Sequence, residues 1–285
     1  MSNFTQTTAA NHIPQQVWAM ETLKAFEAAL VLANIVNKRI TLKGYGAAEI
    51  IPKISNLEAK DTVSNTMVQL QAPVDDKATI TIDQRKHIAC LFEKDLMSQS
   101  ITNLIPEYSQ KIAYGLNKAI DSALAALATG FSGTAGTYNT TLTVAAINAA
   151  VQGLDDADVP RTNRHWVFKP HAVNDLYTLS DYMRYDGTGN KGQYASGSIG
   201  ESMAVTGAKV GRLYGSDVMN TTQMEQSGNN ITNMYIHKDA LALCVQREIG
   251  ISATFEGLLQ GDLVVGSTLF GVGELRDEAG VQVRN

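Results

Sequence analysis

One stretch, residues 98–130, carries the strongest helical pattern in the 285-residue chain and constrains the fold more than any other. Apolar side chains recur there at steps of three and four, so they share one helix face: Ile105, Tyr108, Ile112, Leu116, Ile120, Leu124 and Leu127. Pro106 suits the first turn of such a helix, and Gly130 suits a left-handed turn that would end it. The pattern predicts a helix over residues 106–129, about 36 Å long.

The chain before this helix predicts an arm, a second helix and a hairpin. Residues 1–14 are polar with little to bury, which indicates a surface arm, and residues 15–38 show apolar side chains at helical spacing. A two-stranded ribbon is marginal alone in water, so we expect residues 39–83 to form an arm that lies on a neighbouring subunit. Within it we expect strands at 39–43, 48–54, 67–70 and 78–82, with a polar loop tip at 55–66.

The chain after residue 83 mixes short helices and strands. Residues 86–95 are an apolar segment that leads into the long helix, and residues 129–143 are rich in Gly, Ser and Thr, which predicts a linker. Beyond them we expect helices at 144–155 and 171–180, a turn or short helix at 238–243, and strands at 164–169, 211–219, 233–237 and 242–255. Residues 262–283 should be paired strands with glycines at the turns. Together these elements predict an α+β fold.

Composition limits the class of protein. Hydrophobic residues make up 44% of the chain and charged residues 18%, enough for a large core, and the net charge of −5 argues against a dedicated nucleic-acid binder. Cys90 and Cys244 both lie in apolar runs, which favours free thiols in a reducing compartment. The sequence shows no signal peptide and no apolar run of membrane-spanning length, so we expect a soluble protein made in a cytosol.

The motifs that could carry chemistry are weak. Residues 187–192 match G-x-G-x-x-G, but the hydrophobic strand before it and the helix after it are missing, so we expect a flexible surface loop. Trp166 and Phe168 are most simply core residues of a strand. The other candidates lack the spacing that their chemistry needs: His165 with His171 for zinc, and Asp155, Asp156 and Asp158 for calcium, which favours a solvated loop. We therefore predict no catalytic residue, no cofactor-binding residue and no metal ligand.

The order of these features resembles the major capsid proteins of tailed bacteriophages, of the podovirus-like type, whose fold is shared with encapsulin shells. Local sequence agrees at residues 32–38, 44–46, 50–52, 119–121, 207–218 and 266–271. The resemblance implies five parts: an N-terminal arm and helix over 1–38, an E-loop hairpin over 39–83, a peripheral (P) domain with its spine helix over 84–139, an axial (A) domain over 140–253, and P-domain return strands over 254–285.

The function implied by this resemblance is structural and not enzymatic, with no cofactor. The chain would assemble with itself, through pentamers and hexamers, into an icosahedral head that encloses double-stranded DNA in non-specific contact. A scaffolding protein and a portal protein are implied as further partners, with no membrane; the protein would be made in the host bacterial cytoplasm and end in the virion. Two alternatives stay open: an encapsulin-like cellular shell protein, and an enzyme whose single supporting feature is the loop at 187–192.

Overall fold

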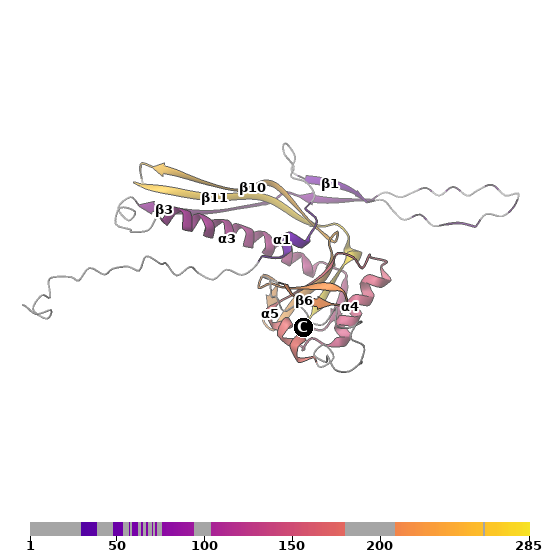
Figure 1. Cartoon of the computed structure of the whole chain (residues 1–285). Helices are drawn as coiled ribbons and strands as arrows, with labels where there is room; N and C mark the ends of the chain where they lie inside the picture. Colours follow the sequence, from indigo (N-terminus) through magenta and orange to yellow (C-terminus); the bar gives the residue numbers. More distant parts are fainter. Residues whose placement is uncertain are drawn as a thin grey trace, which may run out of the picture.

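The computed structural model describes residues 30–38, 48–53, 57, 59–61, 64, 67, 70, 72, 76–93, 104–179, 209–258 and 260–285. Figure 1 shows three described parts: a long platform of strands and one helix, a lobe beside one end of the platform, and a hairpin near their junction. The lobe and the platform differ in how their sheets are covered, and this difference positions the candidate site.

The platform combines a three-stranded antiparallel sheet with one long helix. The strands have the order β10 (Leu241–Glu256), β11 (Gly261–Glu274) and β3 (Gln84–Glu93). Helix α3 (Leu104–Ala126) packs on one face of this sheet and continues into the 3-10 turn η1 (Leu127–Thr129). The predicted helix is confirmed, and so is most of its apolar face, since the following side chains are buried: Ile112, Leu116, Ile120 and Leu124.

The two ends of α3 differ in how well they match the prediction from sequence. Pro106 lies in the first turn, where its missing N–H has no helical partner to lose. Tyr108 stays 46% exposed, although its ring meets Phe92 of β3 edge-on with ring centroids 5.0 Å apart. At the other end Gly130 has a φ of −79° in the right-handed region, so the predicted left-handed turn is wrong. Its N–H donates to the carbonyl oxygen of Leu127 at 2.9 Å instead.

The lobe is built on a seven-stranded sheet. Its order is β4 (Gly133–Gly136), β12 (Gly280–Arg284), β9 (Asn230–His237), β5 (Arg164–Phe168), β7 (Ser216–Asn220) and β6 (Lys209–Leu213), with β8 (Gln226–Ser227) paired to β9. Helices α4 (Val144–Asp156) and α5 (Pro170–Thr178) pack on one face. There Trp166 stacks on Tyr235 with ring centroids 3.8 Å apart, and Phe168 is fully buried. The prediction that Trp166 and Phe168 are core residues is confirmed.

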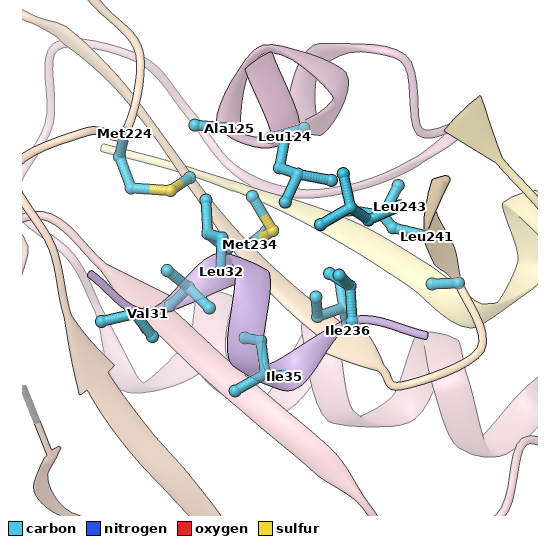
Figure 2. Packing of buried hydrophobic residues seen from close by; sticks show 14 of the residues in the cluster. Val31, Leu32, Ile35, Leu124, Ala125, Met224, Met234, Ile236, Leu241 and Leu243 are labelled. Atoms are coloured by element: carbon cyan, nitrogen blue, oxygen red, sulfur yellow. The ribbon is translucent and has the colours of Figure 1, made fainter. Parts of the chain in front are cut away.

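The opposite face of the lobe's sheet packs against the end of α3 and the short helix α1 (Leu32–Ile35). In Figure 2, Val31, Leu32 and Ile35 lie among side chains from β9 and β10, with Leu124 of α3 close by. This second face is therefore covered over β5 and β9, whereas towards the edge of the sheet Arg212 of β6 and Asp217 of β7 form an ion pair on it, with the arginine exposed. This cluster also joins the lobe to the platform, because α3 and β10 belong to the platform.

The hairpin pairs β1 (Ala48–Lys53) with β2 (Asp76–Thr81), in antiparallel register from Ala48 opposite Thr81 to Lys53 opposite Asp76. Its base crosses β11 closely: a Cβ atom added at Gly271 would lie 2.3 Å from the carbonyl oxygen of Thr81. Only glycine leaves room for this approach. Ile80 of β2 adds an apolar contact at this base, because it packs against Ala242 and Cys244 of β10.

Several predicted elements differ from the structure. The predicted helix over 15–38 ends at Ile35, Val36 is extended and Asn37 forms a β-bridge with Ala242, while its earlier part, 15–29, lies outside the described residues. Met67 and Leu70 do not belong to a strand, so the predicted strand at 67–70 is wrong at both described positions. The predictions at 48–54 and 78–82 are confirmed as β1 and β2, and residues 39–43 lie outside the described residues.

Pairing between distant segments explains the other differences. Residues 86–95 largely form β3, and the predicted linker at 129–143 contains β4, which pairs in parallel with β12. Residues 211–219 belong to two strands because Tyr214 and Gly215 turn the chain with positive φ. The strands expected over residues 262–283 are present as β11 and β12, but they belong to different sheets and do not pair with each other. Gly266, Gly271 and Gly273, expected at turns, lie inside β11, and Gly280 begins β12. The helices at 144–155 and 171–180 and the strands at 164–169, 233–237 and 242–255 are confirmed.

Candidate functional site: an open sheet face and a hairpin

The platform sheet has one face covered by α3 and one face that remains open over much of its length. Alternation along the strands turns Phe92 and Val264 toward α3 and turns Leu91 and Leu263 the other way. Leu91 lies directly opposite Leu263 in the register and is 38% exposed. Further along the same row of β11, Val265 and Leu269 are only half-buried. We call this side of β3, β10 and β11 the open face.

The base of the hairpin occupies one end of the open face. Gly271 and Gly273 have the same strand parity as Leu263 and Leu269, and Cβ atoms added there would meet Thr81 and Ile80 of β2. The chain's own hairpin therefore seats on the junction end of this face. In Figure 1 the β1–β2 pair and the free end of the platform point in opposite directions, so the rest of the open face stays exposed.

Two arginines and a histidine lie on the open face beside the apolar row. Arg85 and Arg247 flank Leu269 on either side of β11, and His87 lies opposite Ser267 one pleat further on. Arg85, His87 and Arg247 are exposed, and none of them forms an ion pair with another described residue. Arginines without an ion-pair partner among the described residues, next to half-exposed leucines, are a surface suited to an acidic and apolar partner.

The segment between β1 and β2 has the complementary composition. Leu57, Met67 and Leu70 are 65%, 96% and 95% exposed. Residues 54–76 carry four carboxylates against one lysine: Glu58, Asp61, Asp75 and Asp76 against Lys60. Nearly full exposure of Met67 and Leu70 means that the described part of the subunit gives these side chains nothing to pack against.

Polar contacts fix the hairpin base to the body. The Sγ of Cys244 donates to Oε2 of Glu49 at 3.2 Å, and both residues are buried. Lys53 pairs with Glu278 of η2 (Asp277–Ala279), with 3.0 Å between Nζ and Oε1. Burial raises the pKa of Glu278, but hydrogen bonds from its own backbone and from Lys53 outweigh burial and hold that pKa below its usual range. These two contacts fix β1 to β10 and to η2.

A pocket of about 560 Å³ lies between the hairpin base, η2 and the loop after α4. Its lining mixes cations with anions: Lys53 and Arg276 with Asp158, Asp239 and Glu278. Such a balanced lining selects neither an anionic nor a cationic ligand. Among the described residues no group of three or more His, Cys, Asp or Glu could hold a metal ion.

The described residues that the sequence suggested for chemistry belong to the lobe: Asp155 and Asp156 end α4, His165 lies in β5 and His171 in α5. The loop at 187–192 lies outside the described residues. Burial lowers the pKa of His165, and its Nδ1 has no hydrogen-bond partner among the described residues, whereas His171 is largely exposed beside Asp175. Asp155 belongs to α4, as the predicted helix has it, and α4 also includes Asp156, where the predicted loop is wrong. The absence of catalytic, cofactor and metal residues stays a prediction.

Asp155 has a structural role at the end of α4. Its carboxylate pairs with Arg161 at 2.6 Å and with the buried Arg164 at 2.8 Å. The hydrogen bond from Arg161 is the main cause that lowers the pKa of Asp155.

Cys90 and Cys244 are free thiols, as predicted, although Cys90 is only partly buried. No helix in the described part of the chain is both long and apolar enough to cross a membrane.

The open face was not predicted from the sequence because its strands are remote in the chain. β3 precedes α3, whereas β10 and β11 come more than 100 residues later. A signal was present in β3, where Arg85, His87 and Leu91 alternate with Ile88 and Phe92. That period-two pattern predicts a strand with one exposed face, but it does not reveal the strands that pair with it.

No protein-family profile and no curated protein matches the sequence. Solved structures do match it in fold. A structure of Mycobacterium phage Che8 is similar at 21% identity and a TM-score of 0.77, covering 96% of this chain and 97% of the other. The capsid of cyanophage P-SCSP1u matches at 17% identity and a TM-score of 0.71, covering 94% and 91%. The mature capsid of bacteriophage PhiM1 matches at 13% identity and a TM-score of 0.74, covering 100% and 96%.

These likenesses run over almost the full length of both chains in each pair. The chain therefore has the fold of these phage capsid structures, and the predicted α+β fold class is confirmed. In that fold, the long helix α3 and the strands of the platform form one continuous extended unit, and the seven-stranded sheet forms a separate lobe.

Proposed function

We propose that this protein is the structural subunit of an icosahedral shell, the head of a tailed phage. The observation that carries the proposal is the full-length match to capsid chains. The surfaces described above support it independently: a single-layer sheet face and a segment with nearly fully exposed Met67 and Leu70 both need a partner. Because each surface is complemented by the other, copies of the same chain can supply that partner.

In the assembly that we propose, residues 54–76 of one copy lie on the open face of the next. The exposed apolar side chains of the segment would pack on Leu91 and Leu263, and its carboxylates would face Arg85 and Arg247. In Figure 1, β1 and β2 extend away from the free end of the platform, which favours a contact between two copies over one within a copy. Burial of about 1,000 Å² in total would qualify as a specific interface.

The direct test is assembly of the purified chain, followed by size-exclusion chromatography and negative-stain microscopy. We expect closed particles from the parent chain, with scaffolding protein added if the chain alone stays unassembled. Replacing residues 55–66 with a short Gly-Ser turn should leave a folded subunit that fails to assemble. Absence of particles from the parent under both conditions would contradict the shell function, and normal particles from the shortened chain would contradict the hairpin contact.

A charge-swap experiment tests the proposed contact at the level of residues. Arg85→Glu with Arg247→Glu should block assembly by placing like charges against the hairpin. Glu58→Lys with Asp61→Lys should block it in the same way. If the two patches meet, combining all four changes in one chain should restore particles. Failure of the combined chain, with each subunit still folded, would show that these charges do not face one another.

We propose a division of the chain that follows its sheets. The N-terminal arm and helix (1–38) and the E-loop hairpin (39–83) keep the boundaries expected from sequence. The expected boundary between residues 253 and 254 falls inside β10, and β12 pairs within the lobe's sheet. The P domain would therefore take residues 84–130 and 241–276, and the A domain residues 131–240 and 277–285.

The contents and further partners of the shell are also part of the proposal. A net charge of −5 suits an inner wall along which packaged double-stranded DNA slides without tight binding. Scaffolding and portal proteins would complete assembly in the cytoplasm of a bacterial host. Nuclease-protected DNA in native particles would support a phage head, whereas an enclosed protein cargo would favour an encapsulin-like compartment. A non-enzymatic role follows from the capsid fold of the neighbours, and saturable nucleotide binding would count against it.

A further inference from the structure

Asp121 of α3 is a fully buried carboxylate that binds backbone N–H groups from a segment 90 residues earlier. Its Oδ2 accepts hydrogen bonds from the N–H of Val31 at 2.7 Å and of Leu32 at 3.3 Å, and its Oδ1 accepts one from the N–H of Ala33 at 2.8 Å. No described lysine, arginine or histidine forms an ion pair with it. Among the described residues, these three backbone N–H groups are therefore the hydrogen-bond donors that satisfy the Asp121 carboxylate.

This arrangement makes Asp121 and the early segment depend on each other. A buried carboxylate without hydrogen bonds is strongly destabilising, so the spine helix needs residues 31–33 in place. In turn, α1 has no side-chain cap of its own, and its first N–H groups would have no other acceptor in this position. The hydrogen bonds to Asp121 thus fix residues 31–33 at one position on α3. Apolar packing alone is not directional and would allow the segment to shift along the helix.

The same segment is tied at its other end to the platform strand β10. The N–H of Asn37 donates to the carbonyl oxygen of Leu241 at 3.2 Å, and the N–H of Leu243 donates to that of Asn37 at 3.0 Å. The Nδ2 of Asn37 also donates to Oδ1 of Asp239 at 2.6 Å, in the turn between β9 and β10. Residues 31–37 are therefore held at both ends, by α3 on one side and by β10 and its turn on the other.

Between these ties the segment fills the joint between the lobe and the platform. Val31, Leu32, Ile35 and Val36 are at most 7% exposed. They pack on Leu124 and Ala125 of α3, on Met234 and Ile236 of the lobe's sheet, and on Leu241 and Leu243 of β10, as Figure 2 shows. Removing the segment would open a cavity where the platform meets the lobe, and the angle between them would lose its main support.

We propose that residues 31–37 are a strap that locks the platform and the lobe at one angle, and that Asp121 is its positioning residue. The proposal rests on the shell function in one respect: a closed shell requires subunits of defined shape, so a subunit with its strap unseated is not competent for assembly. The strap also lies at the end of the proposed N-terminal part (1–38), directly before the proposed E-loop hairpin (39–83) in sequence.

The test on the unassembled full-length chain is amide hydrogen exchange in Asp121→Ala and Asp121→Asn. Losing charged hydrogen bonds should speed exchange at Val31, Leu32 and Ala33 by roughly 10- to 100-fold, with the asparagine variant between the parent and the alanine variant. Exchange in β5 and in the core of β9 should stay as in the parent. Ser122→Ala, an exposed change on the next residue of the same helix, is the matched control and should change nothing.

Unchanged exchange at Val31–Ala33 in Asp121→Ala would overturn the proposal that Asp121 positions the strap. Equal loss of protection across β5 and β9 would also overturn it, because Asp121 would then support the whole fold and not one strap. Assembly gives the second readout: the alanine variant should form few or no particles while its lobe and platform remain folded. If it forms normal particles with the strap unseated, the assembly role fails; if the parent forms none either, the shell function fails while the exchange result still decides whether Asp121 positions the strap.

Discussion

The seven-stranded lobe and the platform solve the same problem, covering a sheet, in opposite ways. In the lobe, α4 and α5 cover one face, and α3 with α1 covers the centre of the other, over β5 and β9. Trp166, Phe168 and Tyr235 are at most 1% exposed there. In the platform, α3 covers one face only, and Leu91 on the other is 38% exposed. One region is complete within a single chain, and in the proposed shell the other is completed by a neighbour.

This difference separates stability from assembly. Substitutions in the lobe should act on the free subunit, because every contact that they remove is already present there. Substitutions on the open face or on the hairpin segment should leave the free subunit almost unchanged and act on the particle. The expected loss of unfolding free energy in the unassembled subunit therefore decreases from the lobe, through the hairpin base, to the segment between β1 and β2.

The largest effect is expected for Trp166→Ala. This change removes the ring that stacks between Tyr235 and Phe168, and the hydrogen bond from its Nε1 to the carbonyl oxygen of Leu213 at 3.2 Å. Truncating a large buried aromatic residue costs about 3–5 kcal/mol, a large share of the stability of a typical domain. Urea unfolding of the free subunit measures it. A loss below about 1 kcal/mol would show that the lobe is less tightly packed than the comparison requires.

A moderate effect is expected for Gly271→Ala in β11. The added methyl group would meet the carbonyl oxygen of Thr81 at 2.3 Å, so β2 has to move away from the platform. We expect a loss of about 1–3 kcal/mol, with faster amide exchange in β2 than in the lobe. Gly250→Ala in β10 is the matched control, because a Cβ there meets nothing within 4 Å. Equal effects of the two changes would mean that the hairpin base is not seated on β11.

The elements that sequence predicted well are those fixed by local pattern. The phase of α3 follows from apolar spacing, and α4 begins where Thr143 offers a side-chain acceptor to the N–H of Ala146. α5 begins at Pro170, whose fixed φ suits a first helical position. The strands β5 and β9 were predictable because buried β-branched and aromatic residues gather in each.

The features that sequence did not predict depend on contacts between remote segments. Asp121 reads as an ordinary polar residue of a helix until its backbone partners, 90 residues away, are in place. Gly271 reads as a turn residue until Thr81 is seen to cross it. The open face could not be predicted from the sequence for the same reason, since it forms only when β3 pairs with β11. The local residue pattern therefore predicts individual helices and strands, whereas the open face and the Asp121 contact depend on which remote segments pair.

A smaller effect, limited to the lobe, is expected from pH. Burial lowers the pKa of both His165 and His237, with Asp217 and Asp239 respectively opposing it. In the unfolded chain both return to an ordinary pKa of about 6.5. Below that pH the unfolded state binds more protons than the folded state, so stability is full above about pH 6.5 and falls as the pH drops through it.

Thermal unfolding of the free subunit between about pH 7.5 and 5.0 measures this loss, since that range brackets the ordinary pKa of histidine. The double variant His165→Gln with His237→Gln should flatten the profile in that range. The carboxylates whose pKa is lowered lose their contribution only at more acidic pH: Asp155, Asp217, Asp277 and Glu278. Burial raises the pKa of Glu274, which adds stability as the pH falls, so the difference between the parent and the double variant isolates the histidines. An unchanged slope in the double variant would place the titrating groups elsewhere.

The smallest effect on the free subunit, and the largest on the particle, is expected for Met67→Ser combined with Leu70→Ser. Both side chains are at least 95% exposed, so the unfolding free energy should change by less than about 0.5 kcal/mol. The particle is different, because there these two side chains would be buried on a neighbour's open face. Losing two buried apolar side chains at each of many identical contacts weakens the closed shell at every one of them.

The matched control is Met67→Leu with Leu70→Met, which exchanges the two side chains and keeps the apolar area. Particle yield by size-exclusion chromatography should fall sharply in the serine variant and stay near the parent value in the control. If the serine variant assembles normally, residues 67 and 70 stay in solvent in the particle. The open face would then be covered by something other than the hairpin segment, and the division between a self-contained lobe and a neighbour-completed platform would need a different partner surface.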